Sequence, residues 1–215
     1  MSYIAERRGE EKERRRAEIL DAAERLYAEK GWEAVTMDQV ARSARLSRAL
    51  LYLYFGDKEE LLFGISERAL KVLTERFEQA QAREPTGMRQ VEAIGRAYMA
   101  YAHEFPHYFD ACARFQAHSG SSQPGSNESA CAQGGDAAIG VVVRAIETGI
   151  ADRTIRADIG SPLLLAVTLW AFTHGVIQLA MAKGADLARF GISVPDLSTY
   201  AMQLLTYAAE APPSA

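Results

Sequence analysis

Apolar residues recur along most of the chain at the three- and four-residue spacing of amphipathic helices, and no stretch alternates long enough to predict a strand. The pattern predicts about nine helices, over residues 12–30, 37–44, 48–54, 57–82, 88–103, 107–118, 137–151, 161–182 and 195–209. Serine and glycine dominate residues 119–135, which predicts a flexible loop. We therefore expect an all-α fold, with an N-terminal three-helix domain over residues 1–56 and a second helical domain over residues 57–211.

Local signals define the second and third predicted helices. Thr36 and Gln39 form a T-x-x-Q capping box that opens the second helix, and Ser47 is placed to cap the third. Arg45 and Leu46 form the tight turn between them. Two short helices joined in this way are typical of a helix-turn-helix, whose second helix lies in the major groove of DNA.

The charge pattern changes this picture in one respect. The 215-residue chain is 48% hydrophobic and carries a net charge of -4, which indicates a globular protein and excludes a generally basic nucleic-acid coat protein. Positive charge is instead local, since one 17-residue span contains four cations and one acid: Arg42, Arg45, Arg48, Lys58 and Asp57. Residues 14–16, all arginine, could add contacts to the DNA backbone. Phosphate neutralisation of this kind predicts salt-dependent binding.

No pattern of catalytic residues is present. The sequence lacks a nucleophile elbow, a P-loop and an H-E-x-x-H motif, so we predict no catalytic residue and no cofactor. His103 and His107 have a metal-ligand spacing, but Pro106 interrupts the helix between them, and we predict no metal. Cys112 and Cys131 are too few for a disulfide framework, and the polar N-terminus is not a secretory signal. A reduced, cytoplasmic setting fits best.

Residues 160–182 contain no Asp, Glu, Lys or Arg and are long enough to span a bilayer. The segment also carries Thr173, His174 and Gln178. A helix that is apolar on all sides can be buried by its own domain and a partner subunit. We predict that the last two helices form a two-fold homodimer interface and that no membrane is involved; a membrane-attached protein is the alternative.

Four fragments occur in an order that is highly specific: ILDAA at 19–23, LYAEKG at 26–31, TMDQVA at 36–41 and SRALLYLYFGDKEELL at 47–62. With them, residues 17–62 resemble the N-terminal domain of the tetracycline-repressor (TetR) family of bacterial transcription regulators. Trp170-x-x-x-His174-Gly175 resembles a signature of one group of the family's C-terminal domains. Arg45 stands where the family often has glycine, so a left-handed backbone there would cost about 1 kcal/mol. Either Arg45 is tolerated and reaches a phosphate, or the turn differs.

The resemblance implies roles for individual residues. Those expected to face base edges are Arg48, Ala49, Leu50 and Leu53. Those expected to bind or position against phosphates are Thr36, Ser47, Tyr52, Tyr54 and Lys58. Arg48 is the forked donor that could read a guanine. Alternatively, Tyr52 and Tyr54 pack the domain, and Leu53 touches the fourth helix.

The second domain is rich in aromatic residues, which could line a small-molecule pocket or be ordinary core. The candidates for the pocket are Tyr98, Tyr101, Phe109, Phe115, Trp170 and His174. The resemblance implies an apolar effector that shifts the fourth helix and separates two reading helices. We therefore predict a dimeric regulator, a repressor that an effector releases from a pseudo-palindromic operator in double-stranded DNA. An activator, or a helical ligand-binding or enzymatic protein that has lost DNA binding, is the alternative.

Overall fold

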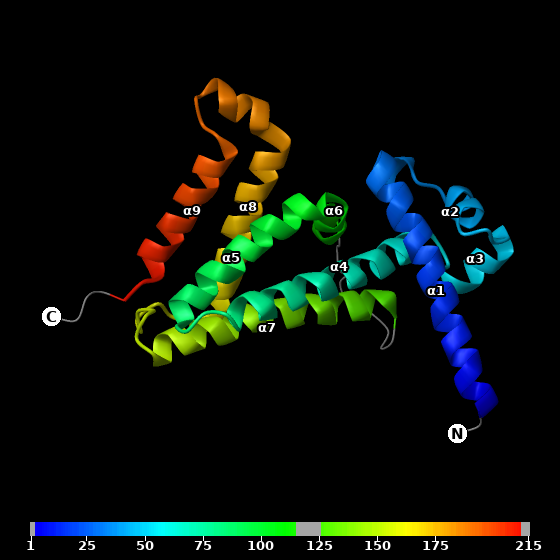
Figure 1. Ribbon diagram of the computed structural model, residues 1–215, viewed down its shortest axis with the longest axis horizontal. Coiled ribbons are helices and arrows are strands. Elements are labelled where there is room, and N and C mark those ends of the chain that lie inside the picture. Colours follow the sequence, from blue (N-terminus) through cyan, green and yellow to red (C-terminus); the bar gives the residue numbers. More distant parts are fainter. Residues whose placement is uncertain (1–2, 115–125, 212–215) are drawn as a thin grey trace. The chain divides into compact units, whose positions relative to one another are not determined.

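Helices make up the fold, as predicted. The computed structural model describes residues 3–114 and 126–211, and within these ranges it contains nine α-helices and one short 3-10 helix (Figure 1). Their bounds are α1 Tyr3–Lys30, η1 Trp32–Ala34, α2 Met37–Ser43, α3 Arg48–Tyr54, α4 Lys58–Gln81, α5 Gly87–Glu104, α6 Pro106–Arg114, α7 Asn127–Ala151, α8 Pro162–Arg189 and α9 Val194–Ala209.

The chain divides into two compact units, which differ from the two predicted domains. The first unit comprises residues 1–70 and 105–133, and the second comprises residues 71–104 and 134–215. The chain passes between the units inside α4, between α5 and α6, and inside α7. The first unit therefore holds α6 and the N-terminal parts of α4 and α7 in addition to the predicted three-helix domain. The functional boundary between residues 56 and 57 stays a prediction.

The first unit is built on one apolar core from α1, α2, α3, α4 and α6. Leu51 and Phe55 are completely buried in it, as their spacing on the third helix predicts, and Ile19 and Leu20 of α1 are equally buried. Burial of such side chains stabilises the fold by roughly 1.5–3 kcal/mol each. The core thus fixes which side of the short helix α3 faces inward.

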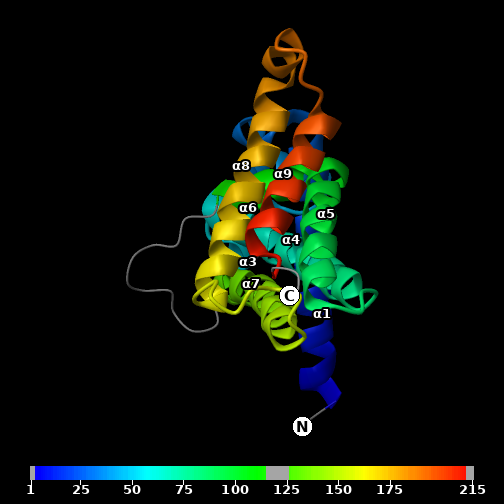
Figure 2. The same cartoon turned by 90° about the vertical axis from the view of Figure 1, so that its left-hand side faces the viewer.

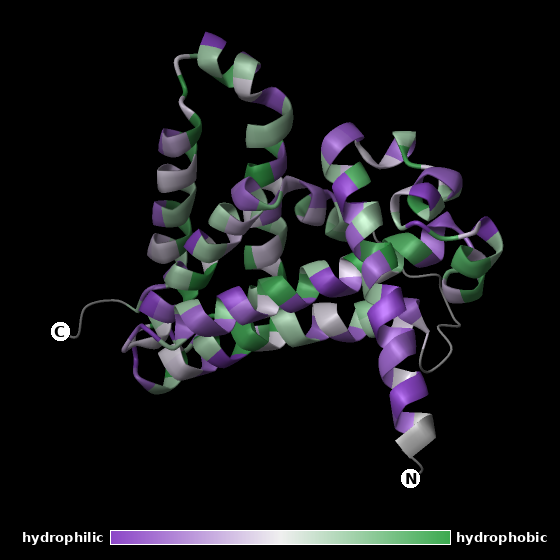
Figure 3. Ribbon diagram, turned by 45° about the vertical axis from the view of Figure 1, so that its right-hand side comes forward, coloured by the Kyte–Doolittle hydropathy of each residue, from purple (hydrophilic) through white to green (hydrophobic). Residues whose placement is uncertain are grey.

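α1 begins at Tyr3, several residues before the predicted start at residue 12. The additional turns are hydrophilic and have no apolar periodicity to reveal them (Figure 3). Where these turns join the predicted helix, ion pairs at helical spacing link Arg14 to Glu11 and Glu18. Such pairs, with residues of good helix propensity, support a helix that buries little surface.

The predicted loop over residues 119–135 is wrong in its second half, because α7 begins at Asn127. The Asn127 side chain accepts a hydrogen bond from Arg16 at 2.8 Å and donates one to Glu60 at 2.7 Å. Cys131, one turn further, is completely buried. These long-range contacts stabilise a helix that its serine and glycine content disfavours. Residues 119–125 lie outside the described residues.

The second unit contains α5, α8, α9 and the C-terminal parts of α4 and α7; α8 and α9 run side by side (Figure 2). Gly87, at the start of α5, lies against α7 so closely that a β-carbon would stand 1.9 Å from the backbone nitrogen of Gly149. The end of α9 is held by the loop between α7 and α8, since the Arg156 amide donates to the Ala209 carbonyl at 3.0 Å.

Helix α8 continues beyond its predicted end at residue 182. The backbone of Lys183 is non-helical, with φ -128° and ψ 19°, and the helix resumes beyond it to Arg189. The predicted end therefore falls at a kink. Within the described ranges, α8 is long and apolar enough to cross a membrane by length and composition, and 22% of its apolar span is buried inside the chain.

The burial of Cys131 gives a test of the early start of α7. Burial raises the pKa of the Cys131 thiol to about 12, with smaller contributions from Glu67 and Glu128. In a Cys112→Ser variant at pH 8, we expect alkylation of Cys131 to be about 10³-fold slower in the folded protein than in urea, because the reactive thiolate is scarce. Since the pKa is higher in the folded state, raising the pH above about 8.5 should favour the unfolded chain. Equal alkylation rates in both states would contradict the helical start at Asn127.

Candidate DNA interface

The turn between α2 and α3 has a left-handed residue at Arg45, with φ 57°. The Leu46 amide donates to the Ala41 carbonyl at 2.8 Å, and the Arg45 amide donates to the Arg42 carbonyl at 3.1 Å. These two bonds form a Schellman motif, which closes α2 and usually places glycine at the left-handed position. Of the two alternatives for this turn, the structure shows the glycine-like one, occupied here by arginine.

Both predicted caps are present. The Thr36 hydroxyl accepts from the Gln39 amide at 3.3 Å, and the Gln39 side chain accepts from the Thr36 amide at 3.0 Å. The Ser47 hydroxyl accepts from the Leu50 amide at 3.2 Å. Thr36 and Ser47 are both exposed. Since capping uses only the oxygen as acceptor, each hydroxyl can still donate its proton to a phosphate.

The outward side of α3 is formed by residues predicted to face bases. Arg48 and Ala49 are exposed, and Leu53 is 79% exposed, so Leu53 does not pack on the fourth helix. Leu50 is half-buried, and Tyr54 packs against the core, which favours the packing interpretation for Tyr54. An apolar side chain as exposed as Leu53 on a rigid helix is suited to contact with a partner.

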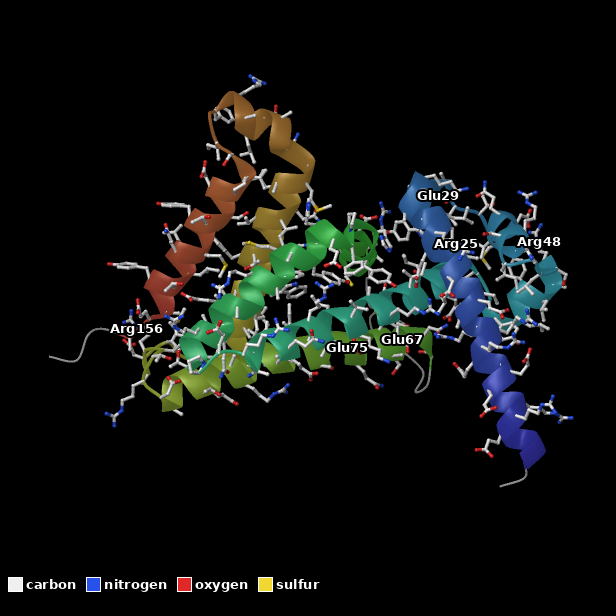
Figure 4. The ribbon with its side chains drawn as sticks, in the orientation of Figure 1. Arg25, Glu29, Arg48, Glu67, Glu75 and Arg156 are labelled. Atoms are coloured by element: carbon white, nitrogen blue, oxygen red, sulfur yellow. The ribbon has the colours of Figure 1, made fainter. Side chains whose placement is uncertain are left out.

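Arg48 is held by two neighbours although it projects into solvent (Figure 4). Its Nε lies 3.2 Å from Oδ1 of Asp38 on α2, and its guanidinium carbon lies 5.5 Å from the centre of the Tyr52 ring. Hydrogen bonding to Tyr52 and the negative charge of Asp38 raise the pKa of Arg48. The guanidinium is therefore a permanent cation with a defined position.

Lys58 has a structural role that the sequence did not reveal. Its Nζ donates to the Trp32 carbonyl at 2.7 Å and lies 4.9 Å from the centre of the Trp32 ring. The ammonium group thus binds the short helix η1 to the start of α4. Since an ammonium group has three donors, the predicted contact to phosphate stays open to it.

The three arginines expected to add backbone contacts are all paired within the chain. Arg14 and Arg15 form ion pairs with Glu11 and Glu18 on α1 itself. Arg16 pairs with Glu67 at 2.8 Å. Exposed pairs of this kind contribute little to stability, so Arg14 and Arg15 can exchange a carboxylate for a phosphate.

Polar contacts between α6 and α1 were missed from the sequence. Tyr27 donates to Asp110 at 2.6 Å, and Tyr108 donates to Glu24 at 3.1 Å. Burial raises the pKa of Glu24, and burial with the nearby Glu24 charge raises that of Tyr108 to about 12. Both tyrosines therefore stay protonated donors. No local spacing rule could pair residues so far apart in the chain.

The predicted pocket residues do not form one cluster. Tyr98 is buried, its hydroxyl lies 2.8 Å from Nδ1 of His174, and the His174 ring lies 6.2 Å from that of Trp170. Burial lowers the pKa of His174, which favours the neutral ring. Tyr101 is completely buried. Phe109 is buried in α6 of the first unit, and Phe115 lies outside the described residues.

A groove of about 510 Å³ lies elsewhere in the second unit, between α5 and α9. Its wall includes Glu92, Met99, Met202 and Thr206, and none of the predicted pocket residues. The Thr206 hydroxyl donates to Glu92 at 2.7 Å across it. The groove has the volume of a small-molecule site but a mixed polar and apolar lining.

A helix-turn-helix with a solvent-facing second helix, joined to a helical C-terminal region, defines a class of DNA-binding transcription regulators. Residues 19–65 match the family model described as bacterial regulatory proteins, tetR family, and residues 91–203 match that of the tetracyclin repressor-like C-terminal domain. The chain belongs to the TetR family. The members of this family are DNA-binding transcriptional regulators, and the family is non-enzymatic.

Three relatives illustrate the similarity. The regulator HbdR of Aromatoleum sp. (strain CIB) is 39% identical over 90 residues, which span 41% of this chain and only 38% of HbdR. The repressor NicS of Pseudomonas putida is 26% identical over 84% of this chain and 86% of NicS. The structure of Bacillus subtilis FadR with stearoyl-CoA has a TM-score of 0.68 at 15% identity, covering 88% of this chain and 97% of FadR. The last similarity concerns the fold alone.

Replacement of Arg45 by glycine should stabilise the protein. Arg45→Gly removes the strain of the left-handed backbone, and the free energy of unfolding should rise by about 1 kcal/mol, measured by urea denaturation. Arg42→Gly is the matched control, because it removes the same charge from within α2 and should lower the free energy by a similar amount. If both variants are destabilised, the turn does not have the left-handed conformation described.

Proposed function

We propose that the protein is a dimeric repressor that binds a pseudo-palindromic operator and leaves it when a small apolar effector binds. The observation that carries the proposal is the exposed tip of α3, where Arg48, Ala49 and Leu53 stand outside a fully packed core. A forked donor and two apolar groups on one helix face match the acceptors and methyl groups of a major groove. A large apolar side chain as exposed as Leu53 is unfavourable in water, so its exposure supports a contact with DNA over a motif that has lost DNA binding.

Within the groove, Arg48 reads a guanine through two hydrogen bonds, and Ala49 or Leu50 contacts a thymine methyl group. Around it, phosphates are bound by residues at the edge of the motif: Thr36, Arg45, Ser47, Tyr52 and Lys58. The capped hydroxyls and the Lys58 ammonium retain the donors that this requires. Contacts to phosphate position the protein, and the contacts of Arg48 supply sequence preference.

Two copies are needed for firm binding. The reading motif is a small positive region on a chain with net charge -4. One copy neutralises few phosphates, so its affinity for DNA is modest. Two copies at fixed spacing bind half-sites about one helical turn apart or somewhat more, and the second contact becomes intramolecular.

The dimer forms through α8 and α9. Large apolar side chains stay exposed along both helices: Leu163, Leu164, Val167, Trp170, Phe172, Leu179, Met181, Tyr200, Leu204 and Tyr207. Exposed apolar surface on this scale marks an interaction site. Gln178, a polar and exposed residue of α8, favours a protein partner over lipid.

The effector binds the second unit, at the aromatic cluster that contains Tyr98, Trp170 and His174. Support comes from the hydrogen-bonded Tyr98 and His174 pair, a polar contact among apolar side chains. An effector that prefers the conformation without DNA weakens operator binding. By linkage, the operator weakens effector binding by the same factor. The FadR structure holds stearoyl-CoA, whose acyl chain is apolar although its coenzyme A group is charged, so long-chain acyl-CoA and the free fatty acid are first compounds to assay. The relative NicS is named as a transcriptional repressor, which supports repression rather than activation. A protein that binds chromosomal DNA must be located in the cytoplasm.

Selection of random duplexes by the purified protein tests DNA reading. The wild type should enrich a pseudo-palindrome with a strongly preferred base pair in each half-site. Arg48→Ala should lose the preference at that base pair by about 10- to 100-fold and keep the other positions.

Arg25→Ala is the control, since Arg25 is an exposed arginine on α1 outside the motif (Figure 4) and should leave the preference unchanged. Failure of the wild type to enrich any palindrome would refute the proposal. If Arg48→Ala and Arg25→Ala change the base preference equally, Arg48 does not read that base pair.

The interface is tested by the mass of the protein in solution. Sedimentation equilibrium without detergent should give twice the chain mass of 23.6 kDa. Val167→Glu places a charge within the exposed apolar face of α8 and should produce monomers, whereas Ala100→Glu on the exposed side of α5 should remain dimeric. A chain recovered only with detergent would favour the membrane alternative, and a dimeric Val167→Glu would place the interface elsewhere.

A further inference from the structure

A carboxylate stands beside the arginine that is proposed to read DNA. Asp38 lies in the first turn of α2, and its Oδ1 and Oδ2 lie 3.2 Å from Nε and 3.5 Å from Nη1 of Arg48 on α3. The two side chains are 52% and 65% exposed, so both are accessible to DNA. The pair therefore joins the two helices of the motif on its outer surface.

Arg48 also packs along its own helix, where its guanidinium lies over the Tyr52 ring. The group thus has a contact from α2 and another from the next turn of α3. A free arginine side chain loses much rotamer freedom when it binds. Two contacts made before binding reduce that loss and restrict the directions in which the guanidinium can point.

Neither folding stability nor attraction to DNA accounts fully for an acidic residue at position 38. Two exposed, solvated charges contribute little to folding stability, and a carboxylate next to a phosphate backbone repels it. Asp57, the other acid between Thr36 and Lys58, differs, because its side chain accepts from the Glu60 amide at 2.8 Å and caps α4. Asp38 also interacts favourably with the start of α2, which is a modest effect. The negative charge of Asp38 weakens binding to DNA of any sequence, so any advantage of Asp38 must come from an effect other than affinity.

We infer that Asp38 is a positioning residue that holds Arg48 for base reading, so that it lowers general affinity for DNA and raises discrimination at one base pair. The inference rests on the proposed role of Arg48. The carboxylate of Asp38 lies against Nε and accepts one N–H group of Nη1, so it does not take up the two N–H groups of Nη2 or the second N–H group of Nη1. These are the donors that a bidentate contact to guanine requires.

The test compares Asp38→Asn, Asp38→Ala and Asp38→Glu with the wild type. Binding is measured to the selected operator, to operators changed at the base pair whose preference depends on Arg48, and to a scrambled duplex. Asp38→Asn and Asp38→Ala should bind the scrambled duplex several-fold more tightly and should lose about tenfold of the discrimination at that base pair. Asp38→Glu keeps the carboxylate and should retain most of the discrimination.

A double-mutant cycle separates positioning from charge. In an Arg48→Ala background, Asp38→Asn should cause no further loss of discrimination, because the group that it positions is gone. Glu29→Gln removes an exposed negative charge from α1 and should leave discrimination unchanged (Figure 4). Thermal melting of each variant identifies any change that comes from unfolding.

The inference is overturned if the Asp38 variants gain affinity for the scrambled duplex but keep wild-type discrimination, since Asp38 would then act by charge alone. It is also overturned if discrimination falls equally at all base pairs. A wild type that enriches no operator would refute the proposed function itself, which is a different result from either.

Discussion

Burial of Leu51 and Phe55 is the constraint on which the exposed side of α3, the proposed reading surface, depends. α3 has seven residues, too few to be stable as an isolated helix. It persists because these two side chains are completely buried in the core of the first unit. Successive residues of a helix are rotated by about 100°, so fixing the inward side also fixes the outward one. Arg48, Ala49 and Leu53 face water for that reason.

The turn before α3 places Leu51 and Phe55 in the core, but it does so with a strained backbone at Arg45. The Schellman motif at Arg45 and Leu46 ends α2 and directs the chain into α3, but it requires a left-handed backbone. Glycine would adopt it without strain. An arginine at this position lowers stability somewhat but places a cation at the edge of the motif, on a chain whose net charge is -4.

The pairing of Asp38 with Arg48 extends this pattern. Arg45 has a strained backbone but supplies a positive charge. In the inference drawn above, Asp38 repels the DNA backbone but orients the Arg48 side chain. The contacts of α6 with α1, through Tyr27 and Tyr108, add a rigid support beneath the motif. With the proposed role of Arg48, this arrangement combines modest general attraction to DNA with a well-positioned reading residue.

The sequence by itself determined the all-α class, the caps at Thr36 and Ser47, the bounds of α3 and the core side of that helix, because these follow from local spacing and local hydrogen bonds. Only the tertiary structure decided the early start of α7, where Asn127 and Cys131 gain contacts with distant helices. The same is true of Lys58 at η1, of the polar contacts of α6, and of the Asp38 carboxylate beside Arg48. Each joins polar groups from different elements, and no periodicity along the chain records which of them meet once the helices are packed.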